Sequence, residues 1–369
     1  MSLKSELLSR HPEIFEDHDV LAMGFFPDSE ITVLARNARS LCVWCTDYAQ
    51  FRNLVPANFA SPDSDNTSNQ DLIFQNKNQT FVFGTAPKPV TRPSKALIYM
   101  SKNKKENIFY IRTACSILPE NSEVFVIGGN DEGVRGMETI LKNSGPSEKY
   151  DYGRKCTLFR LLVTGTSRND ASSASLSTEA SPEYYRAEIG NTDLKVAMIP
   201  GVFSMDRADA GTIFLLENLK DLDLSRVNSI LDAGTGSGII AVFLKKLLPH
   251  ARITAVDVSA FALEATRRTA ILNNAEITVI PSDMLENTAR YDLIISNPPF
   301  HVGKRQVFGP VLNLIRDCPR HLLPGGFFLM VANTFLPYEN HLSQAFCKSG
   351  IKNRNSQYKI LYGFTKSLS

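Results

Sequence analysis

One glycine-rich loop between two apolar segments constrains the fold of this chain more than any other feature. An apolar run at residues 229–231 enters a D-x-G-x-G-x-G loop, and an apolar helical pattern follows from Ile239 to Leu248. The order strand, tight turn and helix predicts an α/β sheet that presents a ligand at the carboxyl ends of its strands. Glycines allow the backbone to take positive φ values and to lie directly against that ligand. The pattern positions of the loop are Asp232, Gly234, Gly236 and Gly238.

The spacing of the glycines distinguishes between classes of ligand. A nicotinamide fingerprint, G-x-G-x-x-G, would have its third glycine at Ile239, whereas the third glycine here is Gly238. The loop has no G-K-[ST] sequence, which excludes a phosphate-binding P-loop. The pattern resembles the S-adenosylmethionine loop of class I methyltransferases. This resemblance implies S-adenosylmethionine as the cofactor, with Asp232, Gly234, Gly236 and Gly238 among its contacts.

A rigid corner follows the buried strand that the apolar run at residues 291–296 predicts. In the sequence N-P-P-F, residues 297–300, two prolines end the strand and fix φ at successive positions. The corner resembles the signature of methyltransferases that modify amino nitrogens. The side-chain oxygen of Asn297 and the carbonyl of Pro298 can accept both N–H groups of such an amine, and Phe300 can stack on a base. These three residues are the predicted catalytic residues, and the chemistry requires no metal.

The ends of two other predicted strands supply further cofactor contacts. Asp257 lies 19 residues beyond the last glycine of the loop (257 − 238), where it can accept both ribose hydroxyls. Asp283 can accept from the adenine amino group, and Met284 can pack on the ring. The predicted cofactor contacts outside the loop are Asp257, Val258, Asp283, Met284 and Asn297.

The residues around the corner are candidates for contacts with the substrate. Lys304 and Arg305 are cations that could hold RNA phosphates, and His301 lies between them and the corner. Residues 196–204 end in a turn, which can be interpreted as a hairpin and loop beside the sheet or as a flap over the cofactor. The predicted substrate contacts are Phe203, Phe300, His301, Lys304 and Arg305.

Length and internal repetition predict two domains, because a chain of 369 residues is longer than a domain with a single hydrophobic core usually is. A pattern of strand, helix, Leu-Pro, strand and helix occurs twice in the chain. Pro119 of the first copy corresponds to Pro324 of the second, which is an offset of 205 residues (324 − 119), and the second copy is expected to end in a helix that reaches Gly350. We expect two tandem class I methyltransferase-like, Rossmann-like α/β domains, the first degenerate, with a Ser/Ala-rich linker between them. The expected boundaries are 1–165, 166–182 and 183–369.

The first domain lacks both the glycine loop and the N-P-P-F corner. Its expected roles are therefore structural support and RNA docking. The candidate phosphate contacts of this domain are Lys102, Lys104 and Lys105.

Composition narrows the class of protein. The net charge is only +2, so nucleic-acid binding would need local basic patches. The first residues have no apolar core of a signal peptide, no run of about 18 apolar residues occurs, and the six cysteines are scattered. Cys42-x-x-Cys45 lies in a strand-like run and is interpreted as core. We expect a cytoplasmic protein, a monomer without a metal or a membrane partner.

Several longer segments together resemble one family, the ribosomal RNA small subunit methyltransferase C family. The segments are 200–204 (PGVFS), 231–236 (LDAGTG), 257–260 (DVSA), 294–301 (IISNPPFH) and 331–338 (VANTFLPY), with 97–99, 102–104 and 154–156 in the first domain. The resemblance implies transfer of a methyl group to N2 of one guanine in 16S rRNA, with the rRNA or the 30S subunit as partner.

Two other functions remain open from the sequence. N-P-P-F also serves methyltransferases that act on other amino nitrogens, such as a protein glutamine or a nucleic-acid adenine. A protein that binds RNA during ribosome assembly, with a vestigial enzyme site, is the alternative from a different class. The intact Asp232, Asp257 and Asn297 argue against a vestigial site.

Overall fold

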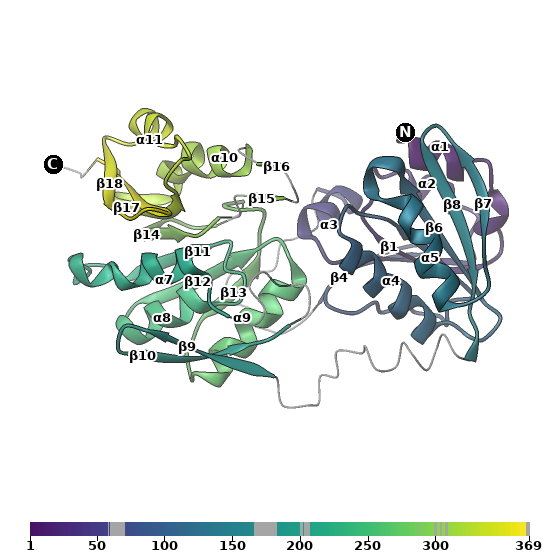
Figure 1. The fold of residues 1–369 in the computed structure, drawn as a ribbon, viewed down its shortest axis with the longest axis horizontal. Coiled ribbons are helices and arrows are strands. Elements are labelled where there is room, and N and C mark those ends of the chain that lie inside the picture. Colours follow the sequence, from purple (N-terminus) through teal and green to yellow (C-terminus); the bar gives the residue numbers. More distant parts are fainter. Residues whose placement is uncertain are drawn as a thin grey trace. The chain divides into compact units, whose positions relative to one another are not determined.

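The computed structural model describes residues 1–57, 59, 71–165, 183–199, 202, 207–286, 288–298, 301–302, 305–306 and 309–366. These residues fall into two compact units, one before and one after residues 166–182 in the sequence (Figure 1). The predicted linker lies outside the described residues. Each unit has its own sheet.

The first unit contains an eight-stranded sheet in the order β3-β4-β2-β1-β5-β6-β8-β7. Its strands are β1 (Asp19–Gly24), β2 (Ser40–Cys45), β3 (Leu72–Asn76), β4 (Gln79–Phe83), β5 (Lys95–Tyr99), β6 (Glu123–Gly129), β7 (Ser147–Gly153) and β8 (Cys156–Leu162). Its helices are α1 (Leu3–Leu8), α2 (Ile31–Leu34), α3 (Tyr48–Leu54), α4 (Lys104–Ile117) and α5 (Val134–Ser144). Cys42 and Cys45 are buried, free cysteines of β2, as the core interpretation predicts.

The second unit contains a seven-stranded sheet in the order β13-β12-β11-β14-β17-β19-β18. The strands of this sheet are β11 (Ser229–Ala233), β12 (Arg252–Asp257), β13 (Thr278–Pro281), β14 (Tyr291–Ser296), β17 (Leu322–Asn333), β18 (Lys348–Arg354) and β19 (Tyr358–Phe364). Two antiparallel pairs stand apart from it: β9 (Tyr184–Ile189) with β10 (Thr192–Ala197), and β15 (His301–Val302) with β16 (Arg305–Gln306). The helices are α7 (Ala210–Glu217), α8 (Ile239–Leu247), α9 (Ala260–Leu272), α10 (Gly309–Asp317) and α11 (Glu339–Ala345).

The two sheets share one topology, which confirms the duplicated architecture expected from the sequence repeat. In each, five parallel strands are followed by two antiparallel strands: β4-β2-β1-β5-β6 with β8-β7, and β13-β12-β11-β14-β17 with β19-β18. The first sheet adds β3 at its edge, antiparallel to β4. One detail of the repeat is wrong, because α11 ends at Ala345 and the residues from Lys348 onward form strand β18 instead of a helix reaching Gly350.

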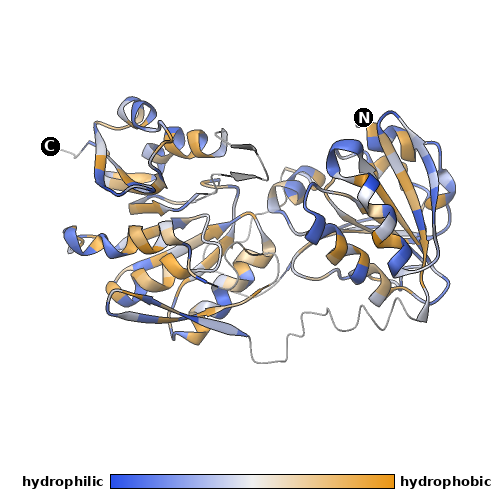
Figure 2. Cartoon of the chain, in the orientation of Figure 1, coloured by the Kyte–Doolittle hydropathy of each residue, from blue (hydrophilic) through white to orange (hydrophobic). Residues whose placement is uncertain are grey.

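The second sheet is buried on both faces, which explains the continuous apolar runs of its strands. Successive side chains of a strand point to opposite faces, so in β14 Leu293 and Ile295 join one apolar cluster while Ile294 joins the other. All three are 0% exposed, and burying each contributes about 1.5–3 kcal/mol. Orange segments accordingly gather along the strands, while much of the blue lies on helices and turns (Figure 2).

Candidate functional site

The glycine loop joins β11 to α8 through three residues with positive φ. The φ values are +76° at Gly234, +58° at Gly236 and +82° at Gly238, a backbone region that residues with a Cβ rarely adopt. A Cβ built at Gly234 or Gly236 would meet nothing within 4 Å, whereas one at Gly238 would lie 2.9 Å from the Cα of Thr266 in α9. The first two glycines therefore border open space, and the third allows two helices to pack closely.

A cavity of about 460 Å³ lies against this loop at the carboxyl edge of the second sheet. Its size falls within the range of roughly 300–1,000 Å³ typical of ligand pockets. Residues from the ends of β11, β12, β13, β14 and β17 and from the start of β19 line it, together with residues of α7, α8 and α9. The lining residues are Val202, Asp209, Thr212, Gly234, Thr235, Gly236, Ser237, Ile239, Ile240, Asp257, Val258, Ser259, Ala262, Ser282, Asp283, Met284, Asn297, Pro298, Asn333 and Tyr358.

Asp257 lies at the tip of β12, beside the loop. Its Oδ2 accepts from the backbone N–H of Gly236 at 3.0 Å, and its Oδ1 accepts from that of Ser259 at 2.9 Å. Burial raises the pKa of the Asp257 carboxyl, and these backbone donors oppose the increase. The carboxylate is thus held in one orientation at the cavity wall, next to the first two glycines of the loop.

Asp232 lies beneath the loop and is 0% exposed. Its Oδ2 accepts from the hydroxyl of Thr235 at 2.7 Å and from the backbone N–H of Ala241 at 3.2 Å. Burial raises the pKa of this carboxyl to about 7, and the charge of Asp257 adds to the effect. Neither Asp232 nor Gly238 lines the cavity; both shape the loop from within the protein, which differs from the direct cofactor contacts expected of them.

The remaining predicted cofactor contacts converge on the cavity wall. Val258 follows Asp257 in the turn after β12, and Asp283 and Met284 follow β13. Asn297 and Pro298 stand directly after β14. Parallel strands bring these segments together because their carboxyl ends meet at one edge of the sheet.

The corner at Asn297 is anchored from two sides. Just before it, the hydroxyl of Ser296 donates to the backbone carbonyl of Ala233 at 2.7 Å, which ties β14 to β11. The amide Nδ2 of Asn297 donates to Asp209 Oδ2 at 2.9 Å and to Thr212 Oγ1 at 2.7 Å. These bonds hold the side chain of Asn297 in one place at the cavity wall.

The structure describes the backbone of two of the five predicted substrate contacts, His301 and Arg305. Phe203, Phe300 and Lys304 lie outside the described residues. His301 and Arg305 belong to the short ribbon β15–β16, in which the backbone of His301 pairs with that of Gln306.

Twelve of the twenty cavity residues were not predicted from the sequence, and four of these are polar residues at the start of α7, the end of β17 and the start of β19. Asp209 and Thr212 belong to the start of α7, and the sequence signal for Asp209 is its place as the N-cap, where its side chain accepts from the N–H of Thr212 at 3.0 Å. Asn333 ends β17 and Tyr358 begins β19, and these two residues pair in register. Helix α11 and strand β18 lie between them in the chain, so no local pattern indicates that they meet at the cavity.

At the corresponding edge of the first sheet, the chain packs closely against itself. A Cβ on Gly24, at the end of β1, would lie 2.0 Å from the carbonyl oxygen of Tyr99, at the end of β5. Trp44 and Tyr110 are 0% and 1% exposed. The Nζ of Lys4 donates to the carbonyl of Met100, just after β5, at 2.7 Å. This carbonyl follows the strand that corresponds to β14, so the ammonium of Lys4 lies beside the position that corresponds to the corner of the second unit.

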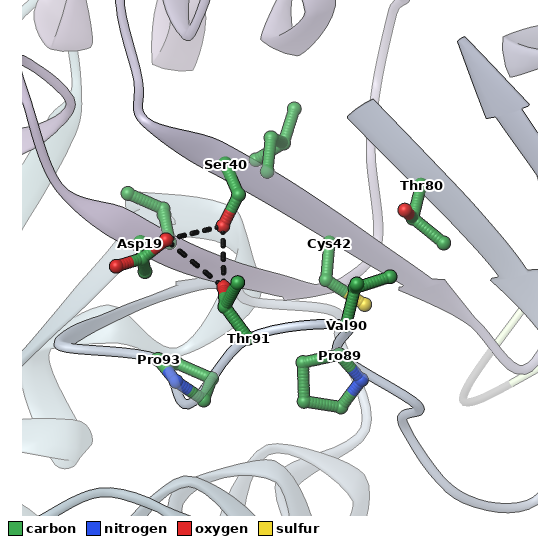
Figure 3. Close-up of a pocket in the computed structure, with 10 residues that line it drawn as sticks. Asp19, Ser40, Cys42, Thr80, Pro89, Val90, Thr91 and Pro93 are labelled. Atoms are coloured by element: carbon green, nitrogen blue, oxygen red, sulfur yellow. Dashed lines mark hydrogen bonds between the residues drawn. The ribbon is translucent and has the colours of Figure 1, made fainter. Parts of the chain in front are cut away.

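A small pocket of the first unit lies at the opposite edge (Figure 3). Asp19 begins β1 and Ser40 begins β2, and the hydroxyls of Ser40 and Thr91 donate to Asp19 Oδ1 at 2.6 and 2.9 Å. The pocket has a volume of about 10 Å³, which is room for about one water molecule. Since α/β sheets bind ligands at the carboxyl ends of their strands, the pocket has neither the size nor the position of a cofactor site.

The residues at the larger cavity fit S-adenosylmethionine. Two glycines border open space, an oriented carboxylate suits the ribose hydroxyls, and an acid with a methionine follows β13. Together with the sheet order, this arrangement defines a class I S-adenosylmethionine-dependent methyltransferase. Family models agree: "Methyltransferase small domain" matches residues 193–362, and "Methyltransferase small domain N-terminal" matches residues 5–174.

The chain belongs to the ribosomal RNA small subunit methyltransferase C family. It is 31% identical over 368 residues to the member from Pasteurella multocida, with 98% of each chain covered. It is 36% identical over 269 residues to the member from Cronobacter sakazakii, covering 72% of this chain and 73% of that one. A solved structure described as the T. thermophilus 16S rRNA N2 G1207 methyltransferase with AdoMet and guanosine shares the fold, with a TM-score of 0.75 at 19% identity over 99% of this chain and 92% of that chain.

The chain is therefore an S-adenosylmethionine-dependent rRNA methyltransferase by family. In the part of the chain that the structure describes, no helix is both long and apolar enough to cross a membrane.

Proposed function

We propose that this protein transfers a methyl group from S-adenosylmethionine to the exocyclic N2 amine of one guanine in 16S rRNA. The observation that carries the proposal is the position of Asn297 and Pro298 on the wall of the cavity that also holds the glycine loop and Asp257. The names of the relatives support rRNA as the substrate, and the description of the T. thermophilus protein supports the guanine amine.

In the proposed complex, the cofactor contacts come from the loop and from the strand ends beside it. Gly234 and Gly236 allow the backbone to approach the ligand, and Asp257 accepts from the ribose hydroxyls. Asp283 accepts from the adenine amino group, and Met284 packs on the ring. The cofactor supplies a methyl group that is already activated by the sulfonium, so the protein needs no nucleophile of its own.

The protein's task at the substrate is to position a weak nucleophile. The lone pair of the guanine amine is delocalised into the ring. The amine therefore has to be oriented for attack, and this matters more than removing a proton from it beforehand. Asn297 Oδ1 and the Pro298 carbonyl each accept one N–H, which favours a pyramidal nitrogen and aims its lone pair at the methyl carbon. As the N–C bond forms, the C–S bond breaks and the nitrogen releases a proton to water.

We further propose that Phe300 stacks on the target base after the base has left its own stack. Removing a base from its stack costs a few kcal/mol, and stacking on an aromatic side chain returns about 1–3 kcal/mol. His301, Lys304, Arg305 and Phe203 are proposed to contact the neighbouring RNA.

The proposed division of the chain is a supporting domain at 1–165, a linker at 166–182 and a catalytic domain at 183–369. In the first domain, Lys104 and Lys105 begin α4, and Lys102 precedes it with a side chain that is 69% exposed. Lys102 pairs with Asp131 at 3.2 Å, an exposed ion pair that contributes at most about 1 kcal/mol. An RNA phosphate could replace this partner, which supports the docking role.

The test is transfer of a labelled methyl group to 30S subunits, to free 16S rRNA and to a protein extract, followed by nucleoside analysis. We expect label on N2-methylguanosine from 16S rRNA in one or both RNA samples. We expect Asn297→Ala to abolish this transfer while its affinity for S-adenosylmethionine stays within a few-fold of the wild type. Asn340→Ala, at an exposed position of α11, is the matched control with unchanged activity.

Three outcomes would overturn the proposal. Label in adenine or in protein would assign the enzyme to another amino nitrogen. No label in any sample, with the cofactor bound, would favour an RNA-binding role. Full turnover by Asn297→Ala would remove this side chain from the mechanism.

A further inference from the structure

The proposed role of Asn297 requires its amide to face one way. The two ends of a side-chain amide have nearly the same shape, but only the oxygen accepts hydrogen bonds, and the nitrogen only donates. If the nitrogen faced the substrate, two donors would meet and the amine would not be held. Some neighbouring group must therefore determine the orientation of this amide.

Two side chains of the α7 terminus surround the amide nitrogen. Asp209 Oδ2 lies 2.9 Å from Asn297 Nδ2, and Thr212 Oγ1 lies 2.7 Å from the same atom. A carboxylate can only accept hydrogen bonds, so the group that faces Asp209 has to be the NH₂ end. The reversed amide would bring two oxygens to about this separation, with like partial charges and no hydrogen between them.

The two neighbours are themselves held in place by local structure. Asp209 is the N-cap of α7, and its Oδ2 also accepts from the backbone N–H of Thr212 at 3.0 Å. Thr212 is 7% exposed. Helix α7 packs against β17 and α8, so the two acceptors are carried on a rigid element. They are 88 and 85 residues from Asn297 in sequence.

We propose that Asp209 and Thr212 are positioning residues for the reaction. By accepting both hydrogens of the Asn297 amide, they turn its oxygen away from α7 and present it as a fixed acceptor for the substrate amine. Neither residue needs to touch the substrate for this role. The inference rests on the proposed function, because it assigns the reason why Asn297 can accept from the guanine amine.

Variants at these two positions separate orientation of the amide from capping of the helix. Thr212→Val removes Oγ1 but keeps the backbone N–H that Asp209 caps. Thr212→Ser restores the hydroxyl. Asp209→Asn keeps an oxygen that can accept from both donors, whereas Asp209→Ala removes it. The control is Asp47→Ala, which removes the cap that accepts from Gln50 N–H at the start of α3 in the first unit.

The first measurement is the turnover number with 16S rRNA and S-adenosylmethionine. We expect kcat to fall roughly tenfold in Thr212→Val and about 10²–10³-fold in Asp209→Ala, by analogy with the loss of one oriented group at a reacting atom. Thr212→Ser and Asp209→Asn should retain most of kcat. The KM for rRNA and the Kd for S-adenosylmethionine should stay within about threefold in Thr212→Val. Asp47→Ala should keep the wild-type kcat.

The second measurement does not depend on activity. In the protein loaded with S-adenosylmethionine, the side-chain NH₂ protons of Asn297 should exchange with water at least about tenfold faster in Thr212→Val than in the wild type, since one hydrogen bond of about 1.4 kcal/mol corresponds to tenfold. Asp47→Ala should leave this exchange rate unchanged.

The outcomes distinguish this inference from the proposed function. Wild-type kcat and wild-type amide exchange in Thr212→Val and Asp209→Ala would overturn the positioning role. A parallel loss of kcat and cofactor affinity in Thr212→Val would also overturn it, because that result assigns Thr212 to the cofactor. If the wild type itself methylates no guanine, the proposed function fails, while the exchange rates still report whether the two residues hold the amide.

Discussion

Replacing Gly236 and Gly238 by alanine, one at a time, should damage two different properties of the protein. Both residues have positive φ, +58° and +82°, and the left-handed region costs a residue with a Cβ about 1–2 kcal/mol. At Gly236 the added methyl group meets nothing within 4 Å. At Gly238 it would lie 2.9 Å from the Cα of Thr266, and overpacking of this kind costs about 1–3 kcal/mol more. The expected loss of folding free energy is therefore about 1–2 kcal/mol for Gly236→Ala and about 2–5 kcal/mol for Gly238→Ala.

The expected order for cofactor binding is the reverse. The methyl group at Gly236 projects into the space beside Asp257 that the ligand has to fill, so the complex bears the overpacking cost of about 1–3 kcal/mol. This energy corresponds to a roughly 5- to 150-fold weaker affinity for S-adenosylmethionine. Gly238 does not line the cavity, so folded Gly238→Ala should bind within a few-fold of the wild type.

Urea unfolding without cofactor and calorimetric titration of the cofactor measure the two effects. Far-UV circular dichroism should follow the unfolding, because the single tryptophan, Trp44, lies in the first unit and reports only on that unit. Wild-type affinity in folded Gly236→Ala would refute the position of the cofactor against this loop. Equal destabilisation by the two substitutions would refute the packing argument at Gly238.

Three further predictions concern charge and stacking. Burial raises the pKa of the Asp232 carboxyl from 3.8 to about 7, so between these pH values the folded protein holds a proton that the unfolded chain releases. The free energy of unfolding of the protein should therefore fall from pH 4 to pH 7 by an amount on the order of 4 kcal/mol. Urea titrations of Asp232→Asn should show this pH dependence removed, and equal slopes in both proteins would contradict the argument. Phe300→Leu should lower kcat/KM for rRNA more than Phe300→Tyr, because stacking needs an aromatic face, and equal values would indicate packing alone. The triple variant Lys102→Gln, Lys104→Gln and Lys105→Gln should bind rRNA more weakly and keep its cofactor affinity. The slope of log binding constant against log salt concentration should become shallower by roughly one unit for each phosphate that is no longer neutralised. An unchanged slope would exclude these lysines from RNA docking.

The central strands of the second sheet were largely predictable because they are buried on two faces. Continuous apolar runs locate β11 and β14 within two residues of their observed bounds. The edge strand β18 was mistaken for the end of a helix. Its residues from Lys348 to Arg354 are mostly exposed and polar, so they carry neither an apolar run nor a clear alternation that would indicate a strand.

The candidate site was predictable where a local backbone conformation strongly selects one residue type. Positive φ strongly favours glycine, and all three glycines of the loop have it. The separation of roles within the loop was not predictable. Gly234 and Gly236 border the cavity while Gly238 packs on Thr266, and Asp232 points beneath the loop to Thr235 and Ala241. Spacing alone cannot show which side of a turn faces solvent.

What the sequence by itself determined is therefore the local geometry: a glycine turn after one strand, a proline corner after another, and the order of strands and helices. These features depend on backbone dihedral preferences and hydrophobic periodicity, which act over a few residues. The tertiary structure alone decided which distant groups meet. Asp209 reaches Asn297 across 88 residues, and Asn333 faces Tyr358 through antiparallel pairing. Such contacts depend on how the sheet and its helices pack, and no short segment of the chain encodes that packing.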